Sequence, residues 1–333
     1  MNDSRNSYFD FLRGIAIIMV VGIHTFSRSN GGFDSLVGTC NVIGRQILNC
    51  AVPLFLAISG FFLGYKDLSD KEKRLAFWKH QIPKVYLPAL IWGFPWFVLS
   101  MLEGENIVLS IVFWLIGGLS IFYYISLTIQ YYLLLPYIQK APPLRCVMAA
   151  AVISIVSISF VTHIRAFECI ELPLIIYAGP FPVWLIFFVL GVTLQKSKRD
   201  YSLVWVVIAI IASLLLQIIE THYLIKIGAQ GYGIKISSFL FSAFIIILFF
   251  SNRIERVFNQ NSILNKMIVY IGSISFGIYL SHMLVYRVLK YWSFFDGWHG
   301  WYIRWIIVLS ADILVVVILK RILPEKVSRI CGL

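Results

Sequence analysis

Charged side chains are scarce in this sequence. Only 13% of its 333 residues are Asp, Glu, Lys or Arg, whereas 59% are hydrophobic, and the mean hydropathy is +0.84. A water-soluble protein of this size could not cover so much apolar surface with so few charges. The composition therefore excludes a soluble globular protein and predicts that the bilayer surrounds most of the chain.

Cysteine is also scarce, and its spacing contains no metal-binding or redox motif. The five cysteines are Cys40, Cys50, Cys146, Cys169 and Cys331. None forms a Cys-x-x-Cys pair, which argues against a zinc site and against a disulfide framework. We expect no metal. Cys40 and Cys169 both fall in outer loops on the topology below, so a bridge between them stays open.

No Ser/Gly/Pro-rich linker, low-complexity tract or internal repeat interrupts the chain. We therefore predict one transmembrane domain over residues 1–333. A cleavable signal peptide is not expected, because the first apolar segment carries Arg13 and His24 and lacks a small-residue cleavage site. This first segment is predicted to stay in the membrane as a helix.

Long apolar segments recur along the chain, each close to the roughly 20 residues that a spanning helix needs. The sequence predicts an all-α integral membrane protein, a single bundle of about ten transmembrane helices. The predicted spans are 8–26, 45–64, 85–102, 119–138, 146–162, 180–195, 201–219, 236–251, 267–289 and 301–321. Segment 107–118 is predicted to lie at the interface or to enter the membrane partway.

The positive charges lie in short loops. Although the net charge is +12, no long basic stripe or tail is present, which argues against nucleic acid as a partner. With ten spans, 20 of the 28 Lys and Arg residues fall on the side of the N-terminus, including all six in the basic loop 66–84. Because Lys and Arg accumulate in cytoplasmic loops, both termini are predicted to be cytoplasmic.

Two ionisable residues lie in the first predicted span. Arg13 and His24 are 11 residues apart, which on an α-helix is about 16 Å of rise and three turns plus about 20°, so they share one face. Considered singly, Arg13 can snorkel to the headgroups and His24 can be a hydrogen-bonded core residue. Ionisable groups inside a membrane usually face a polar cavity or the bundle interior, so their shared face favours a functional role.

Two further segments carry polar or small residues inside predicted spans. The run 52–64 contains Ser59 and several small residues, which permit close helix packing. The run 272–282 places His282 beside Tyr279 and Ser281. Asp312 in the last span needs a partner, and a relay with His282 and an ion pair with Arg304 or Arg287 are equally favoured.

Aromatic residues cluster at 92–97, 122–132 and 291–305, near the ends of predicted spans. Trp and Tyr accumulate at membrane interfaces. We therefore predict that these clusters anchor the helices at the interface rather than stack on a substrate.

These motifs together resemble the acyltransferase-3 superfamily of bacterial membrane acyltransferases, and the resemblance covers essentially the whole chain. The opening motif of the family is matched by Asp10, Leu12, Arg13, Gly14 and His24. Later motifs resemble Val52 to Gly60, Lys84 to Pro88 (with lysine where many relatives carry arginine), Phe122 to Pro136, and Gly272 to His282. Five motifs in the right order make coincidence improbable.

The resemblance implies a bundle of about ten helices in the bacterial inner membrane. It also implies transfer of an acyl group, acetyl from acetyl-CoA, to a hydroxyl of a surface glycan or lipid-linked sugar, with membrane lipid as the surroundings. His24 is implied as general base or transient acyl acceptor, and Arg13 as essential; His282 is the third catalytic candidate. The candidate donor- or substrate-binding residues are Asp10, Ser59, Lys84, Tyr279 and Ser281.

The different depths of Arg13 and His24 predict a conduit. Acyl-CoA would enter from the cytoplasm, Arg13 would engage its phosphate or pantetheine end, and the acyl carbonyl would reach His24. The basic loop 66–84 can bind nucleotide phosphates or serve only as a positive-inside loop, and Lys84 is its strongest candidate. This chain has no hydrolase-like extracytoplasmic domain of the kind that larger relatives carry, so we expect it to complete transfer itself or to pass the acyl group to a partner.

Two other classes of function stay open. A transporter or flippase would also place ionisable residues in the membrane, but such proteins commonly show two related halves with broken helices in matching positions, and the sequence indicates neither. A scaffold or sensor that has kept the fold without activity is the third class. The intact Arg13 and His24 argue against it.

Overall fold

The computed structural model describes residues 6–27, 30–166, 168, 170, 172–197, 199–229, 231–291 and 300–333. Within these ranges every regular element is a helix. The helices are α1 (Ser7–Thr25), α2 (Leu36–Ile47), the 3-10 turn η2 (Leu48–Cys50), α3 (Ala51–Leu63), α4 (Lys71–Leu102), α5 (Ile107–Ile116), α6 (Tyr123–Lys140), α7 (Pro143–Ala166), α8 (Leu174–Ala178), α9 (Phe181–Lys196), α10 (Leu203–Lys226), α11 (Ile236–Phe249), α12 (Asn252–Val257), α13 (Ile263–Ser273), α14 (Ser275–Lys290), α15 (Trp301–Ile322) and α16 (Glu325–Ile330).

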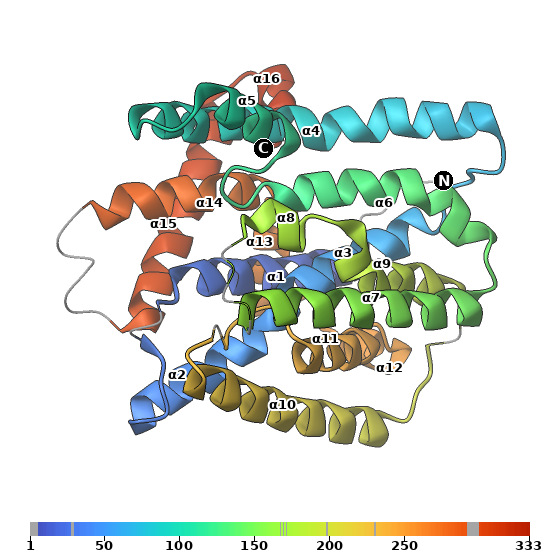
Figure 1. Ribbon diagram of the computed structural model, residues 1–333. Helices are drawn as coiled ribbons and strands as arrows, with labels where there is room; N and C mark the ends of the chain where they lie inside the picture. The colour runs from blue at the N-terminus through green and yellow to red at the C-terminus, as the bar shows by residue number, and fades with distance from the viewer. Residues whose placement is uncertain are drawn as a thin grey trace.

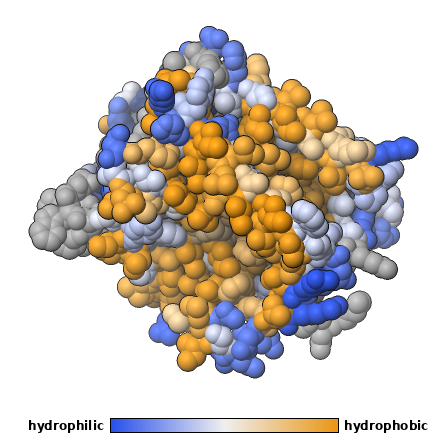
Figure 2. All heavy atoms as spheres, turned by 90° about the horizontal axis from the view of Figure 1, so that it is seen from below, coloured by the Kyte–Doolittle hydropathy of each residue, from blue (hydrophilic) through white to orange (hydrophobic). Residues whose placement is uncertain are grey.

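The outward face of the bundle is apolar. Six helical segments are long and apolar enough to cross a bilayer, and the bent pair α13 and α14 makes a seventh. Helix α10, at the bottom of Figure 1, exposes large apolar side chains along its length, among them Val204, Trp205, Ile208, Ile211 and Leu215. Figure 2 views the molecule from this side and shows a broad hydrophobic face with hydrophilic residues mainly toward its edges. The predicted all-helical, multi-pass membrane protein is confirmed.

Each of the ten predicted spans coincides with helical structure, but three of the helices are less clear spans. Helices α9 and α11 are apolar but have fewer than 18 residues, and α6 includes Gln130, Gln139 and Lys140. Helix α5 covers the segment predicted to lie at the interface and ends at Gly117, whose φ is 72°. The count of ten spans and the cytoplasmic side of both termini stay predictions.

The predicted span 267–289 is not continuous. Helices α13 and α14 meet at an angle of 77°, because Ile274 leaves the helical conformation with φ −111° and ψ 11°. The break lets α13 lie against α1 at Gly272 while α14 turns to bring His282 to the end of α1. A methyl group on Gly272 would lie 1.8 Å from the carbonyl oxygen of Asp10, so the two backbones are in direct contact.

Helices α1 and α3 occupy the centre of the bundle in Figure 1, between α4 and α5 on one side and α10 on the other. Helix α3 packs against α9 through glycine. A Cβ on Gly60 would lie 2.2 Å from the Phe188 carbonyl oxygen, and one on Gly191 would lie 2.1 Å from that of Ala57. Small residues permit such approach inside membranes, and here they fix α3, which carries Ser59, against α9.

The aromatic cluster 122–132 is not an interfacial belt, and that prediction is wrong. Tyr123, Tyr131 and Tyr132 are buried. The Tyr131 ring stacks on Phe188 with centroids 4.6 Å apart and planes 6° apart. Burial of aromatic rings contributes large apolar area and specific geometry, so these tyrosines fill the interior where α6 meets α9.

The cluster 291–305 lies partly outside the described residues, which omit 292–299. Trp301 is fully buried. Its indole N–H donates to the Gly22 carbonyl at 2.9 Å, and that of Trp305 donates to Ile18 at 2.8 Å. These two tryptophans therefore attach α15 to the second half of α1 instead of anchoring it at the interface.

The possible disulfide between two outer-loop cysteines has no support. Cys40 is an exposed free thiol. Cys169 lies outside the described residues.

Candidate active site

Helix α1 places two functional side chains at two depths, as the spacing predicts. Its first turn is capped by Asn6, whose side-chain oxygen accepts from the Tyr8 N–H at 3.0 Å. Nineteen residues then run without a break to Thr25. Arg13 and His24 line two different cavities of the protein.

The structure pairs His24 with His282. Their ring centroids are 5.2 Å apart and their planes differ by 46°, although one ring comes from α1 and the other from α14. The structure thus brings these two candidate residues close together. Both lie at the end of α1 held by Trp301.

His282 is held in one orientation by the backbone. Its Nδ1 lies 3.0 Å from the Ile278 carbonyl oxygen and 2.9 Å from that of Tyr279. Because carbonyl oxygens only accept, Nδ1 carries the proton and Nε2 keeps its lone pair. Nε2 is buried and has no hydrogen-bond partner among the described residues. A buried acceptor of this kind is uncommon and is available to a proton from a neighbouring group.

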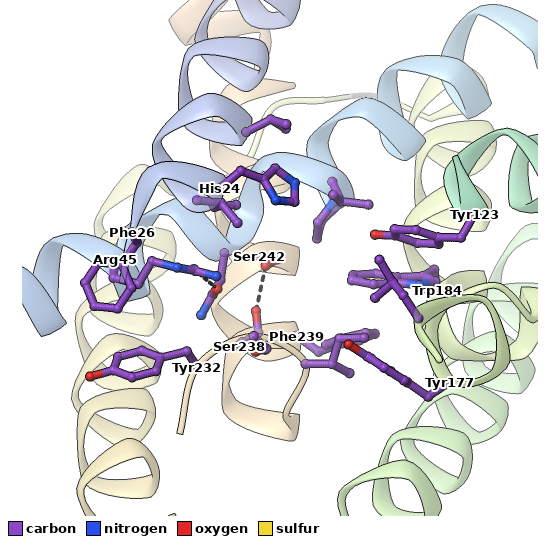
Figure 3. Close-up of a pocket in the computed structure, with 18 of the residues that line it drawn as sticks. His24, Phe26, Arg45, Tyr123, Tyr177, Trp184, Tyr232, Ser238, Phe239 and Ser242 are labelled. Carbon is purple, nitrogen blue, oxygen red and sulfur yellow. Dashed lines mark hydrogen bonds between the residues drawn. The ribbon is translucent and has the colours of Figure 1, made fainter. Parts of the chain in front are cut away.

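The His24 cavity has a volume of about 330 Å³. Figure 3 shows His24 and Arg45 on one side of it, with Tyr123, Trp184 and Tyr177 opposite. Its remaining walls come from η2, α3, α7, α8, α11 and the segment before α11. They include Asn49, Pro53, Arg165, Tyr232, Gly233, Ser238, Phe239 and Ser242. The cavity combines aromatic faces with cationic and hydroxyl groups, a lining suited to a polar ligand with hydroxyls.

The Arg13 cavity is smaller, about 170 Å³. It is lined by Arg13, Phe55, Ser59, Val85, Tyr124, Ile125, Thr128, Tyr132, Ser275, Phe276 and Tyr279. Arg13 donates to Asp10 at 2.8 Å and lies over the Phe62 ring, 5.1 Å from its centroid. The buried Asp10 carboxylate thereby holds the guanidinium beside the cavity.

The two cavities follow one another along the same helices. Helices α1, α3 and α6 each contribute side chains to both. Tyr279 lines the Arg13 cavity, and its ring centroid is 6.2 Å from that of His282, which in turn contacts His24. The histidine pair therefore lies where the cavities approach each other. The described residues line two separate cavities, and the conduit stays a prediction.

Four predicted site residues line neither cavity: His282, Asp10, Ser281 and Lys84. Asp10 acts through Arg13, as described above. Ser281 is fully buried and donates to Asp312 at 2.6 Å, and Lys84 is exposed on α4 next to Val85, which lines the Arg13 cavity. Ser59 and Tyr279 line that cavity as predicted, but the Tyr279 hydroxyl donates to the Ile121 carbonyl at 2.7 Å.

The ion pairs considered for Asp312 do not form. Its described hydrogen bond comes from Ser281. Arg287 instead donates to Glu103 at 2.5 Å, and Arg304 donates to Asn30. The relay with His282 has no support either, because the partners of His282 Nδ1 are backbone carbonyls.

The basic loop 66–84 is partly neutralised by its own acids. Lys73 donates to Asp67 at 2.5 Å and lies 3.4 Å from Asp70. The hydrogen bond from Lys73 lowers the pKa of the Asp67 carboxyl to about 2, so this acid stays ionised at neutral pH. The surface charge available for phosphate is therefore smaller than the number of lysines suggests.

The sequence patterns did not indicate three residues that line the His24 cavity: Arg45, Tyr123 and Trp184. Arg45 could have been predicted, because it is the first residue of a predicted span and ionisable residues in membrane segments tend to face cavities. Tyr123 and Trp184 could not have been predicted. An aromatic residue at the end of a helix has the same sequence pattern whether it anchors the helix at the membrane interface or lines a cavity.

The bundle and its paired histidines define a class: a polytopic helical membrane protein with an internal site. The acyltransferase-3 family model, described as an acyltransferase domain, matches residues 6–321, and the chain belongs to this family. No curated protein and no solved structure is significantly similar to it. The resemblance found in the motifs is confirmed, and the family places the protein among membrane acyltransferases.

Proposed function

We propose that this protein transfers an acyl group, acetyl from acetyl-CoA, to a hydroxyl of a cell-surface glycan or lipid-linked sugar. The observation that carries the proposal is the His24–His282 pair, with ring centroids 5.2 Å apart. His24 lines one cavity, and the His282 ring neighbours that of Tyr279, which lines the other. A transferase needs to bring two substrates to one proton-accepting group. Two cavities that approach each other at an imidazole meet that requirement.

In this proposal the acceptor occupies the His24 cavity and the acyl end of the donor extends from the Arg13 cavity. His24 takes the proton from the acceptor hydroxyl, whose oxygen attacks the thioester carbonyl. The new C–O bond forms, the C–S bond breaks, and the CoA sulfur leaves with the proton that His24 returns. A positioned base typically accelerates such a step by about 10²–10⁴-fold.

His282 is a positioning residue for His24. Its Nδ1–H is fixed by two carbonyls, and its Nε2 is left as an acceptor. No hydrogen bond joins the two imidazoles in the described structure, so the proposal has the His24 N–H nearest His282 donate to this Nε2 once the substrates are bound. The other nitrogen of His24 then carries the lone pair toward the cavity, which is the state that a general base requires.

Arg13 binds the donor, supported by Asp10 at 2.8 Å. A pantetheine arm is long and narrow and suits the Arg13 cavity, while the nucleotide remains outside. The exposed Lys84 next to Val85 lies where such a nucleotide would emerge. Ser59 offers a hydroxyl in the same cavity, and Ser281 supports α14 through Asp312.

The predicted topology fits this division of roles. Arg13 belongs to the cytoplasmic half of α1, where acyl-CoA is available, and His24 to the outer half, where surface glycans are assembled. In a bacterium the site would therefore face both sides of the inner membrane.

A transporter or flippase is the alternative, and one observation bears on it. The α13–α14 break resembles the broken helices of transporters, which usually occur in matching positions of two related halves. In the part of the chain that the structure describes, only this pair is bent in that way. The lack of a matching second break favours the transferase.

The test uses the full chain in nanodiscs with radiolabelled acetyl-CoA and a surface-glycan extract. Wild type is expected to release CoA and to label the glycan, and His24→Ala to do neither. His163→Ala is the matched control, since His163 is exposed, lines neither cavity and pairs with Glu168 at 3.3 Å. If wild type moves glycan across the membrane without labelling it, the transporter class is correct.

A further inference from the structure

We infer that the acceptor carries a negative charge, a carboxylate or a phosphate, and that Arg45 binds it in the His24 cavity. This inference rests on the proposed function, because it names the class of acceptor. It is drawn from the burial of Arg45, from its partners and from the charges that surround it.

Arg45 is buried with 7% of its surface exposed and yet lines the cavity. Its Nη1 donates to the Asn49 side-chain oxygen at 2.5 Å, and its guanidinium carbon lies 6.0 Å from the centroid of Phe26. A guanidinium has five N–H donors. Among the described residues no carboxylate lies within ion-pair distance of it.

Burial of a cation without a counter-charge raises the free energy of the folded protein, because the loss of hydration is not offset by an ion pair. Such a group persists where it has a role, and an anionic ligand supplies the missing charge. Arginine also binds carboxylate and phosphate groups through two parallel hydrogen bonds. The position of Arg45 in the wall of the cavity makes those donors available to a bound molecule.

A second basic residue and an acid lie near Arg45. Lys235 is buried behind it, and its Nζ donates to the Gln46 side-chain oxygen at 2.5 Å and to the Gly231 carbonyl at 3.0 Å. Glu220 is the acid of this region, but it accepts from the Ser237 N–H at 3.2 Å and from the Ser237 hydroxyl. Glu220 does not line the cavity.

The cavity lining carries positive charge. Its charged members among the described residues are Arg45 and Arg165, and none is acidic. Arg165 lies 4.0 Å from the centroid of the Tyr177 ring. A neutral sugar would require no such lining, whereas an anionic sugar gains from it.

The arrangement also orients the ligand. His24 and Arg45 extend into the cavity from one side, and Tyr123, Trp184 and Tyr177 face them (Figure 3). A sugar ring whose charged substituent meets Arg45 would lie against these aromatic faces and present a neighbouring hydroxyl to His24. Arg45 is therefore a specificity-determining residue for the acceptor.

The experiment measures binding of three small probes to the full chain in nanodiscs of zwitterionic lipid. The probes are methyl glucuronide, glucose 1-phosphate and methyl glucoside. Wild type is expected to bind one of the anionic probes about ten- to a hundredfold more tightly than the neutral one, as charge-assisted hydrogen bonds typically provide. Whichever anionic probe binds more tightly tells carboxylate from phosphate.

Three variants complete the test. Arg45→Gln is expected to lose the preference for the anionic probe, and Arg45→Lys to keep part of it. Arg287→Gln is the matched control, because Arg287 pairs with Glu103 and lines neither the His24 nor the Arg13 cavity. Retained acetyl-CoA binding shows that each variant is folded.

The inference is overturned if the neutral probe binds wild type as tightly as the anionic ones, if no probe binds, or if Arg45→Gln keeps the preference. The first two outcomes are measured on wild type alone, so the inference can be refuted even if a variant does not fold. Failure of the proposed function has a different signature: anionic probes bind through Arg45, but no acyl transfer from acetyl-CoA occurs.

Discussion

Gly272→Ala is expected to destabilise the protein by forcing α13 away from α1. The new methyl group would lie 1.8 Å from the Asp10 carbonyl oxygen and 2.8 Å from the Gly14 nitrogen. Ordinary contact of a Cβ begins at 3.4 Å, so the backbones must separate locally by the difference between 3.4 and 1.8 Å, which is 1.6 Å. Both obstructing atoms belong to the backbone of α1 and cannot rotate away.

Overpacking of a close-packed site typically costs about 1–3 kcal/mol. In a chain of this size each kcal/mol lowers Tm by roughly 2 °C, so a decrease on the order of 5 °C is expected. Function should suffer as well. Asp10, whose carbonyl is displaced, holds Arg13 at 2.8 Å, and acetyl-CoA binding should therefore weaken.

The assay is thermal unfolding in nanodiscs, with Gly277→Ala as the matched control on the next helix. A Cβ on Gly277 would lie 3.1 Å from Leu333 Cδ2 and Val316 Cγ1. Both are side-chain atoms that need to move only a few tenths of an ångström, so the Tm should change little. Equal Tm values for Gly272→Ala and wild type would refute the backbone contact between α1 and α13.

Four further predictions concern the site and the topology. Arg13→Ala should weaken acetyl-CoA binding about ten- to a hundredfold in calorimetric titration, because a charge-assisted contact is lost. His24→Ala should leave that binding nearly intact and lower the rate of CoA release by about 10²–10⁴-fold. His282→Ala should lower the same rate by roughly tenfold, the worth of one lost orienting hydrogen bond, without changing donor binding. Reporters fused near residue 70 and at the C-terminus should be cytoplasmic, and one inserted near residue 168 should be outside.

Each of these predictions has a contrary result. Normal turnover in His24→Ala together with normal CoA binding in Arg13→Ala would exclude the proposed mechanism. Total loss in His282→Ala, in protein that still binds acetyl-CoA, would mean that both imidazoles transfer protons. Reporters near residues 70 and 168 on one side of the membrane would remove the argument that donor and acceptor enter from opposite sides.

The sequence predicted part of the site because helical geometry is local. Arg13 and His24 share one face of α1 by their spacing alone, and the structure places each in a cavity. The spacing of Tyr279 and His282 in α14 was likewise visible. What spacing cannot show is the 77° break before α14, where Ile274 leaves the helical conformation and Gly272 lies against a helix far away in the sequence.

The sequence pattern of the aromatic residues does not distinguish an interfacial position from a buried one. Tyr123 and Trp301 lie near span ends, where a membrane belt and an interior position have the same sequence pattern. Both are buried, and the Trp301 indole donates to the Gly22 carbonyl. Only the packing of α15 on α1 and of α6 on α9 decided between the two interpretations.

The sequence by itself determined that the protein is helical, lies in the membrane and belongs to the acyltransferase-3 family, because hydropathy, helix length and motif order are properties of the chain read along its length. The tertiary structure alone brought His24 to His282, joined Ser281 to Asp312, and left Arg45 in a cavity wall without a described carboxylate partner. These relations join residues on different helices. They depend on how close two backbones can approach, and that is set by glycines and buried rings acting together across the bundle.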